Sequence, residues 1–422
     1  MRESQTHHID KAQNLAIAVL AVCAVFLFTR TELFQLAWSA LGVDFPLFPE
    51  ARTVQTAAGP TALALPVRLA VSDGSGRRYG NTVLTTGSEA FVPVRPLFSQ
   101  ALDGDAPLQT GTRADFLRAL DDVSVFCDFL HPLPLALTAG VLDAPEAREE
   151  GEIRCAVLAR DLSRTVLFLW DGDGGYYRRD TEIAFADLEE AVSSYLLGNA
   201  WFSLDRAVPE EQTVAPLSLL PRTTPALPVL SATDGLADPD RLLTALRMNP
   251  RTNFRYSESN GTEVIMEGAR SVRIRANGSV YYRSGGRTDL RIDCAGEVPT
   301  SWEAVRGCTA LLDEVLPWGG VRAYPTGVQR EGERTVVYFG YQWRGLPIRF
   351  SDGGSAAVAV LEGKAVSSLE IRARRYAATG ETCLLLPLTQ VLGIASQRPG
   401  AELSLAYVDG GGTVTQAQWL LD

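Results

Sequence analysis

Histidine is nearly absent from this chain of 422 residues, which contains three. His7 and His8 stand at the amino terminus, so His131 is the one imidazole in the rest of the sequence. Ser-His-Asp catalysis, Cys-His catalysis and histidine-rich metal sites each need at least one well-placed imidazole. Because His131 lies between Leu130 and Pro132 at the end of a predicted helix, and no G-x-S-x-G motif occurs, we interpret it as a capping or surface residue.

Lysine is almost missing as well, since Lys11 and Lys364 are the two in the chain. Arginine supplies nearly all the positive charge, which we interpret as a bias of the coding DNA rather than as a phosphate site. Acidic residues outnumber basic ones by 50 to 39, and the formal net charge is -11. Nucleic-acid binding needs a basic footprint, so the overall charge argues against a nucleic-acid partner.

The six cysteines are scattered, with no C-x-x-C pair and no nearby histidine. Zinc ligands cluster in sequence, so we expect no structural zinc, no other metal site and no cofactor. The spacing of Cys294 and Cys308 is compatible with one disulfide across a loop. The sequence leaves this open, because the distance between the two Cα atoms decides.

Acidic and glycine-rich motifs offer no enzyme signature. The segment DGDGGYYRRDTE places Asp171, Asp173 and Glu182 at positions 1, 3 and 12 of an EF-hand loop. That loop also needs an oxygen ligand at position 5 and glycine at position 6, where Gly175 and Tyr176 stand instead. We expect a hairpin tip with solvated acids there, and plain turns at SDGGS and YVDGGGT. Acids abound, but no local motif selects a carboxylate pair.

A long apolar run near the amino terminus predicts a membrane anchor. Residues 12–28 read AQNLAIAVLAVCAVFLF, with Lys11 before the run and Arg30 after it. An apolar helix of about 17 residues is at the short end of those that span a bilayer. Signal-peptide cleavage prefers small residues around the cut, and Trp38 before Ala40 does not fit. We therefore favour an uncleaved anchor over a cleaved signal peptide.

This run predicts a single-pass protein of the cell membrane, with a cytoplasmic tail over 1–11, an anchor over 12–30 and a large ectodomain outside. A second run of 18 apolar residues does not occur. Small residues allow close helix packing in lipid, although they are common in any apolar span. The partner-contact candidates in the anchor are Ala12, Ala16, Ala18, Ala21 and Ala24.

The ectodomain predicts an α+β fold of two to three modules, each an antiparallel meander sheet packed on one or two helices. The proline-rich stretch 207–237 is the expected linker. It separates an N-terminal α+β domain, 42–206, from a middle α+β domain, 238–300, and a C-terminal α+β domain, 301–422. A helix followed by a meander occurs from 238 and again from 301, which indicates two related domains.

Apolar spacing predicts helices over 112–130, 185–200, 238–248, 301–318 and 384–396, with strands between them. Thr112 and Asp238 are expected as N-caps, whereas Ser301 followed by Ala304 lacks a full capping box. Asn260 and Asn277 each precede glycine, which favours hairpins with type I′ turns. The turns account for both N-x-[ST] matches, so we expect no glycosylation.

The stretch VVYFGYQWRGLPIRF, residues 336–350, is rich in strand-forming side chains on both faces. We interpret it first as a structural strand, covered on one face by a helix and on the other by a neighbouring domain or a partner. Pro347 cannot donate a ladder hydrogen bond, which indicates that the strand ends or lies at an edge there. Tyr341 and Trp343 are the partner-contact candidates in this stretch.

The carboxy-terminal part resembles the YycH/YycI regulatory proteins of Gram-positive bacteria. The residues that carry the resemblance are YFGYQWRGLPI, with Tyr341, Gly345, Pro347 and Ile348, followed by AVAVLEGKAVSSLEIRARRY, LPLTQVLGI and the closing AYVDGGGTVTQAQWLLD. The resemblance covers about 225–422 and, more loosely, the anchor. The arginine-rich composition and the region 42–206 depart from a close match.

The resemblance implies regulation rather than catalysis. Family members are membrane-anchored, extracytoplasmic proteins that bind and modulate the sensor histidine kinase of a two-component system controlling cell-wall metabolism. The partners it implies are that kinase and a paralogous accessory regulator, contacted through the membrane helix and the ectodomain. Two alternatives stay open: a cell-envelope hydrolase that uses a carboxylate pair, and a passive envelope protein that binds a ligand.

Overall fold

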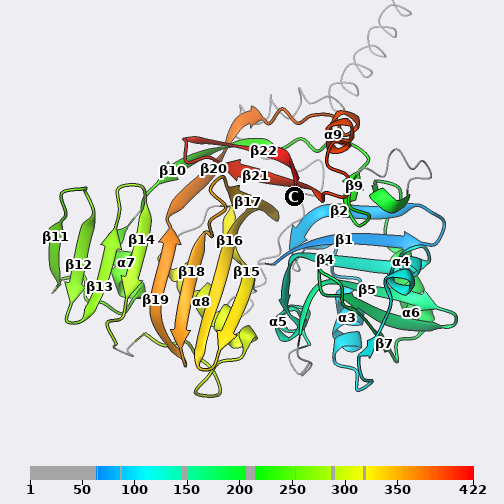
Figure 1. Cartoon of the computed structure of the whole chain (residues 1–422), viewed down its shortest axis with the longest axis horizontal. Helices are drawn as coiled ribbons and strands as arrows, with labels where there is room; N and C mark the ends of the chain where they lie inside the picture. The colour runs from blue at the N-terminus through cyan, green and yellow to red at the C-terminus, as the bar shows by residue number, and fades with distance from the viewer. Residues whose placement is uncertain are drawn as a thin grey trace, which may run out of the picture. The chain divides into compact units, whose positions relative to one another are not determined.

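The computed structural model describes residues 63, 65–85, 88–144, 151–205, 214–236, 238–251, 253–286, 290–316 and 320–422. All of them belong to one compact unit, Gln55–Asp422. As predicted, the fold is α+β, and within these ranges it has two large, mostly antiparallel sheets and seven α-helices (Figure 1). The predicted tail and anchor, 1–30, lie outside the described residues, and no helix of the described ranges is long and apolar enough to cross a bilayer.

The first sheet has nine strands, and every neighbouring pair is antiparallel. Its spatial order is β3 (Gln109–Thr110), β7 (Tyr176–Asp180), β6 (Arg164–Trp170), β5 (Glu152–Asp161), β4 (Val123–Pro134), β1 (Pro66–Asp73), β2 (Arg78–Thr85), β8 (Ala200–Phe202) and β9 (Leu219–Pro221). The helices that accompany it are α3 (Arg95–Leu102), α4 (Arg113–Leu120), α5 (Leu135–Val141) and α6 (Phe185–Ser193), with a 3-10 turn at Ser203–Asp205.

The predicted helix over 112–130 is wrong in its second half. Thr112 caps α4 as expected, because its hydroxyl accepts a hydrogen bond from the amide of Asp115, but the helix ends at Leu120. The strand β4 begins at Val123 and runs through the middle of the sheet, with α4 packed on one of its faces and α3 and α6 on the other. A strand buried on both faces has no alternation to distinguish it from a buried helix.

The second sheet has thirteen strands, and β15 joins it by pairing with β16 alone. Its order is β11 (Phe254–Ser257), β12 (Glu263–Glu267), β13 (Arg270–Ile274), β14 (Ser279–Arg283), β19 (Ala365–Arg372), β18 (Ala357–Glu362), β16 (Arg334–Trp343), β17 (Leu346–Phe350), β21 (Leu403–Asp409), β22 (Val414–Leu421), β10 (Pro228–Asp234) and β20 (Arg374–Thr382), with β15 (Val321–Glu331) beside β16. The accompanying helices are α7 (Pro239–Ala245), α8 (Ser301–Val315) and α9 (Leu388–Ala395).

Strand pairing joins the ranges 238–300 and 301–422, because β14 pairs antiparallel with β19. The two ranges therefore contribute to one sheet rather than to two. The range 207–237, expected as a linker, contains β9 and β10. The second of these strands pairs with β20 and β22.

Helix caps follow the sequence with one correction. Asp238 caps α7 as predicted, and its carboxylate accepts hydrogen bonds from two backbone amides of the first turn. The helix α8 is capped one residue earlier than expected, by Thr300 rather than Ser301. Thr300 and Glu303 form a complete capping box, so the expectation of an incomplete box is wrong.

The two predicted Asn-Gly hairpins are present, but their turns are not type I′. That turn needs a positive φ at both central residues, whereas here Gly261 and Gly278 have a φ of 79° and 78° and the asparagines do not. In the second hairpin the amide of Gly278 donates to the carbonyl of Arg275 at 3.0 Å, as in a type I turn closed by a left-handed glycine. Asn260 and Asn277 instead accept hydrogen bonds from the backbone two residues ahead.

The aromatic-rich stretch 336–350 forms β16 and β17, with a two-residue turn at Arg344 and Gly345. Pro347 neither ends a strand nor lies at an edge of the sheet, because β17 stands between β16 and β21. Pairing with β21 begins only at Ile348, so the missing N–H of Pro347 leaves no gap in that ladder.

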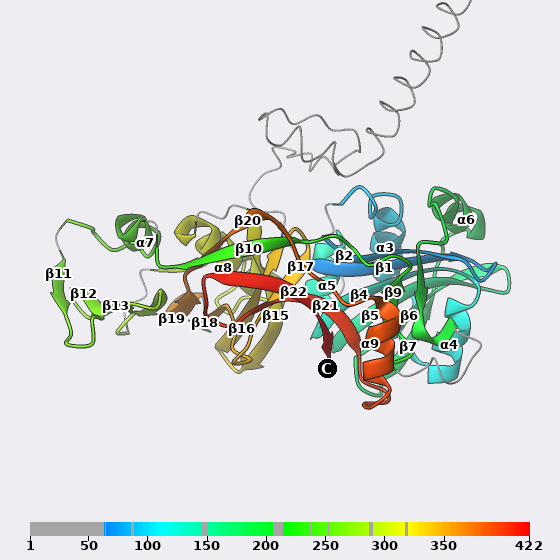
Figure 2. The same ribbon diagram turned by 90° about the horizontal axis from the view of Figure 1, so that it is seen from above.

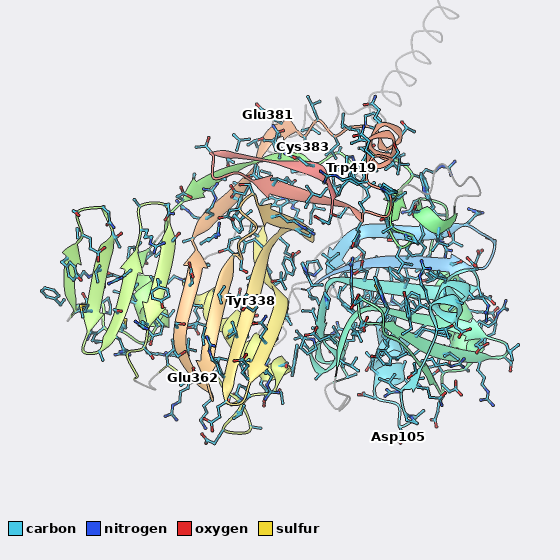
Figure 3. All side chains as sticks on the ribbon, viewed as in Figure 1. Asp105, Tyr338, Glu362, Glu381, Cys383 and Trp419 are labelled. Atoms are coloured by element: carbon cyan, nitrogen blue, oxygen red, sulfur yellow. The ribbon has the colours of Figure 1, made fainter. Side chains whose placement is uncertain are left out.

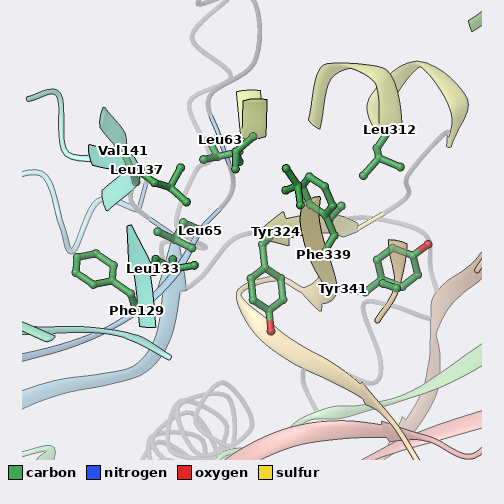
Figure 4. Close-up of a cluster of buried hydrophobic side chains, with 14 of the residues drawn as sticks. Leu63, Leu65, Phe129, Leu133, Leu137, Val141, Leu312, Tyr324, Phe339 and Tyr341 are labelled. Carbon is green, nitrogen blue, oxygen red and sulfur yellow. The ribbon is translucent and has the colours of Figure 1, made fainter. Parts of the chain in front are cut away.

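The two sheets share one apolar core (Figure 4). Figure 4 shows Leu133 of β4 and Leu137 of α5 facing Tyr324 of β15 and Phe339 of β16. The view in Figure 2 shows α9 beside β9, where Val391 packs with other buried residues of a small satellite core. Side chains from distant parts of the chain therefore meet where the first sheet adjoins β15 and β21.

Candidate functional site

Four charged side chains meet at this junction, and we call them the charge cluster: Arg68 of β1, Asp128 of β4, Arg154 of β5 and Glu402, just before β21. Nη2 of Arg68 lies 2.7 Å from Oδ2 of Asp128, and Nε of Arg154 lies 3.2 Å from Oδ1 of the same carboxylate. Nη2 of Arg154 lies 2.6 Å from Oε2 of Glu402, which also pairs with Arg68. Register explains the placement, because Arg68 stands opposite Asp128 in the β1–β4 ladder.

Burial and mutual charge decide what the charge cluster can do. Burial by itself would raise the pKa of the Asp128 carboxyl, but Arg68 and Arg154 outweigh it and the pKa is lowered. The pKa of Glu402 is lowered in the same way. Both carboxylates therefore stay ionised and engaged by guanidinium groups, which does not suit a general acid.

Two pockets flank the charge cluster, and Glu402 lines both. The first pocket is lined mainly by His131, Tyr324, Pro347, Arg349, Ser404 and Trp419. The second is lined mainly by Arg113, Leu117, Trp170, Tyr176, Pro216 and Ser218. In the second pocket the rings of Trp170 and Tyr176 stack, with centroids 6.2 Å apart.

His131 lies in β4 and not at a helix end, so the expectation of a capping or surface residue is wrong. Its ring is half-buried and stacks on Tyr324, with the centroids 6.3 Å apart. Burial, and then the charges of Arg349 and Arg154, lowers its pKa to about 4. The imidazole is therefore neutral at physiological pH. Among the described residues, no group of three His, Cys, Asp or Glu side chains is placed to hold a metal ion.

The other sequence candidates fall into three groups. The alanines of the predicted anchor, Ala12, Ala16, Ala18, Ala21 and Ala24, lie outside the described residues. Tyr341 and Trp343 are buried in the core, and the Tyr341 hydroxyl donates to the carbonyl of Arg372, so neither side chain is on the surface to contact a partner. The loop after Trp170 is a hairpin tip between β6 and β7, as expected, with the Asp171 carboxylate accepting from backbone amides of that tip.

The disulfide left open by the sequence does not form. Cys294 and Cys308 are both free thiols, as are the other cysteines of the described ranges. Cys308 is buried on α8, whereas Cys294 donates its S–H to the carbonyl of Gly296 in the preceding loop.

A second feature is an exposed face at one end of the thirteen-stranded sheet, which we call the aromatic face: Phe254 and Tyr256 of β11, Met266 of β12 and Tyr281 of β14. Phe254 is 66% exposed, and the other three side chains are exposed as well. Phe254 stands opposite Met266, and register places Tyr256 and Tyr281 on the same side. On the opposite face β12 and β14 bury Ile265, Val280 and Tyr282, whereas all four residues of β11 are exposed.

The segment that carries the aromatic face is rich in arginine. Between residues 247 and 283 the sequence has seven arginines and three glutamates, in a chain whose net charge is -11. Arg273 lies on the same side of the sheet as Tyr281, directly opposite it in the β13–β14 ladder. The aromatic face is thus locally basic on an acidic protein, which favours contact with acidic groups.

Comparison of the chain with known protein families, with curated proteins and with solved structures finds no match. Neither the charge cluster nor the aromatic face followed from a motif. Arg68 and Glu402 are 334 residues apart, so no local spacing links them. The alternation in β11 and β12 indicates two faces, but it does not say which face the rest of the protein covers.

Proposed function

We propose that this protein is a non-enzymatic regulator of the YycH/YycI type, which binds and modulates a two-component sensor histidine kinase that controls cell-wall metabolism. In this proposal residues 12–30 anchor it in the cell membrane, and the α+β ectodomain lies outside. The kinase and a paralogous accessory regulator come from the sequence resemblance. The observation that carries the proposal is the aromatic face.

The composition of the aromatic face supports contact with a protein. Tyrosine, phenylalanine, methionine and arginine are enriched in the centres of protein interfaces, and tyrosine and arginine are frequent hot spots. The fold itself does not need these side chains, because the opposite side of β12, β13 and β14 buries Ile265, Val272 and Tyr282 in the core. Large apolar side chains gathered on an exposed surface favour an interaction site.

The position of the aromatic face also supports a protein partner. Its outer strand, β11, pairs with β12 on one side, and β11 ends the order of the thirteen-stranded sheet in the described residues. An edge strand offers backbone groups to an added strand of another protein. The excess of arginine in this segment favours an acidic part of the kinase ectodomain in that place.

The hydrolase alternative has less support. Glycoside hydrolysis needs a carboxylic acid that keeps its proton beside a second carboxylate. Asp128 and Glu402 are close together, but Arg68 and Arg154 lower the pKa of both. This pair is therefore suited to holding the two sheets together rather than to proton transfer.

Co-purification tests the proposal. The full-length protein is solubilised in mild detergent with each sensor histidine kinase of its host, and kinase recovery is compared between wild type and the double variant Phe254→Ser/Tyr256→Ser. Loss of two hot-spot side chains is expected to lower recovery at least tenfold, on the order of 2 kcal/mol or more per hot spot. Leu196→Ser is the matched control, because Leu196 is also exposed and apolar but lies far from β11 in sequence.

The outcomes separate the parts of the proposal. Recovery of no kinase with the wild-type chain contradicts the regulatory function itself. Recovery that is equal for wild type and the double variant contradicts the role of the aromatic face. Removal of residues 1–40 is expected to weaken recovery further if the membrane segment also contacts the kinase, as the resemblance implies.

A further inference from the structure

The chain between β20 and β21 has an unusual surface. From Thr382 to Gln397 there is no charged residue. Within this segment Leu384 is 98% exposed, Ile394 is half-exposed and Leu386 is exposed. We call these three side chains the aliphatic tip.

The packing of α9 explains why the aliphatic tip faces outward. Val391 and Ala395 of this helix are buried with Leu220 of β9 and Leu403 of β21 in the satellite core. Val391 and Ala395 are four residues apart and mark the buried side of the helix, whereas Ile394 and Gln390, also four apart, are exposed.

The segment before α9 is held firmly in place. The amide of Ala417 donates to the sulfur of Cys383, and the indole N–H of Trp419 donates to the carbonyl of Leu386 at 3.0 Å. Figure 3 shows Cys383 and Trp419 close together at this end of the sheet. Leu384 and Leu386 are thus presented by an anchored backbone.

The chemistry of the aliphatic tip differs from that of the aromatic face. It offers leucine and isoleucine, without tyrosine, methionine or arginine, and leucine is under-represented among protein hot spots. Leu384, which is nearly fully exposed, and Leu386 lie in the segment before α9, and Ile394 lies in the helix itself. Aliphatic side chains on an uncharged segment, with a tryptophan beside it, match the requirements of the boundary between lipid headgroups and acyl chains.

We infer that the aliphatic tip inserts into the surface of a lipid bilayer, as a second membrane contact besides the predicted anchor. The occupant is the lipid itself, independent of the kinase. Because the chain carries a net charge of -11, anionic lipid repels the protein as a whole, so apolar burial provides the attraction. Insertion is therefore expected in zwitterionic phosphatidylcholine and is expected to be insensitive to salt.

Fluorescence depth measurement tests this inference on the full chain in phosphatidylcholine vesicles. Cys23 and Cys294 are replaced by serine, and a single cysteine carrying the environment-sensitive dye NBD is introduced by Ile394→Cys. The emission is expected to shift to the blue on lipid contact and to be quenched by nitroxides on the acyl chains. The control is Leu196→Cys, at a leucine that is 86% exposed elsewhere on the protein, and its label is expected to stay in water.

A second variant tests whether Leu384 contributes to the membrane contact. Leu384→Asp, added to the Ile394-labelled chain, is expected to abolish the blue shift and the quenching. The fold tolerates this change, because the Leu384 side chain is exposed to solvent. A dye at residue 394 that stays in water in vesicles overturns the inference, and so does one that becomes shielded only when a purified kinase is added. Neither result bears on whether the kinase binds, which the co-purification measures separately.

Discussion

Removal of one charge from the buried pair Arg374–Asp409 is expected to destabilise the thirteen-stranded sheet strongly. Asp409 ends β21 with a side chain that is 0% exposed. Its Oδ1 accepts from Nη2 of Arg374 at 2.9 Å, and its Oδ2 accepts from Nε of Arg374 and from the hydroxyl of Tyr376 at 2.5 Å. The change Asp409→Asn keeps the shape and removes the charge.

The expected magnitude follows from burial. Breaking a buried ion pair by removing one partner costs about 3–5 kcal/mol, because the remaining charge is left without compensation. Here Arg374 retains Asp234, which is partly exposed, and the carbonyl of Gly412. We therefore expect a loss near the lower end, ~3 kcal/mol of the free energy of unfolding.

A neighbouring pair provides the control. Arg372 lies two residues before Arg374 and pairs with Asp352 at 2.8 Å, but the Asp352 side chain is 59% exposed. Exposed ion pairs contribute about 0–1 kcal/mol, so Asp352→Asn is expected to have little effect. Urea denaturation followed by tryptophan fluorescence measures both variants under the same conditions. An equal loss for the two variants, or none for Asp409→Asn, would refute the argument from burial.

Three further predictions concern single residues. Glu402→Gln is expected to lower the free energy of unfolding by about 1–3 kcal/mol at pH 7. Because the pKa of Glu402 is lowered in the folded state, that contribution is present above its unfolded value of about 4.3 and is lost as the pH falls through the folded pKa. The difference in unfolding free energy between wild type and variant should therefore shrink as the pH of the denaturation series is lowered below about 4.3. Gly278→Ala is expected to cost more than Gly261→Ala in thermal unfolding: both glycines have a φ near 79°, but a Cβ at Gly278 lies 2.7 Å from a backbone nitrogen, whereas nothing lies within 4 Å at Gly261. Iodoacetamide is expected to modify Cys294 in the native protein and Cys308 only after unfolding, as peptide mass mapping can verify, and protection of both thiols would contradict the free Cys294.

Local patterns predicted those elements whose signals are local. The sequence signals for the cap at Asp238 and for the hairpins around Asn260 and Asn277 each span only a few neighbouring residues. Each of these elements occurs where it was expected. The strand from Val123 was predicted as helix because apolar residues at 116, 120 and 123 fit a helical period. Burial on both faces removes the alternation that distinguishes a central strand.

The candidate site depends on contacts that no local pattern encodes. The charge cluster needs Arg68 in register with Asp128 and then Glu402 from the far end of the chain. The aromatic face needs knowledge of which side of β12 and β14 packs on the core. Tyr341 has the composition of an interface residue and is buried, since sequence specifies side-chain chemistry but not exposure.

The span of the charge cluster has a consequence for biosynthesis. A chain leaves the ribosome from its amino terminus, and N-terminal parts begin to fold first. All nine strands of the first sheet are synthesised by Pro221, yet Arg68 and Arg154 can meet Glu402 only after β10 to β20 have also been synthesised. The nascent sheet therefore exposes two arginines that share a single carboxylate, Asp128, and its full stabilisation waits for a residue that is synthesised much later than the sheet itself.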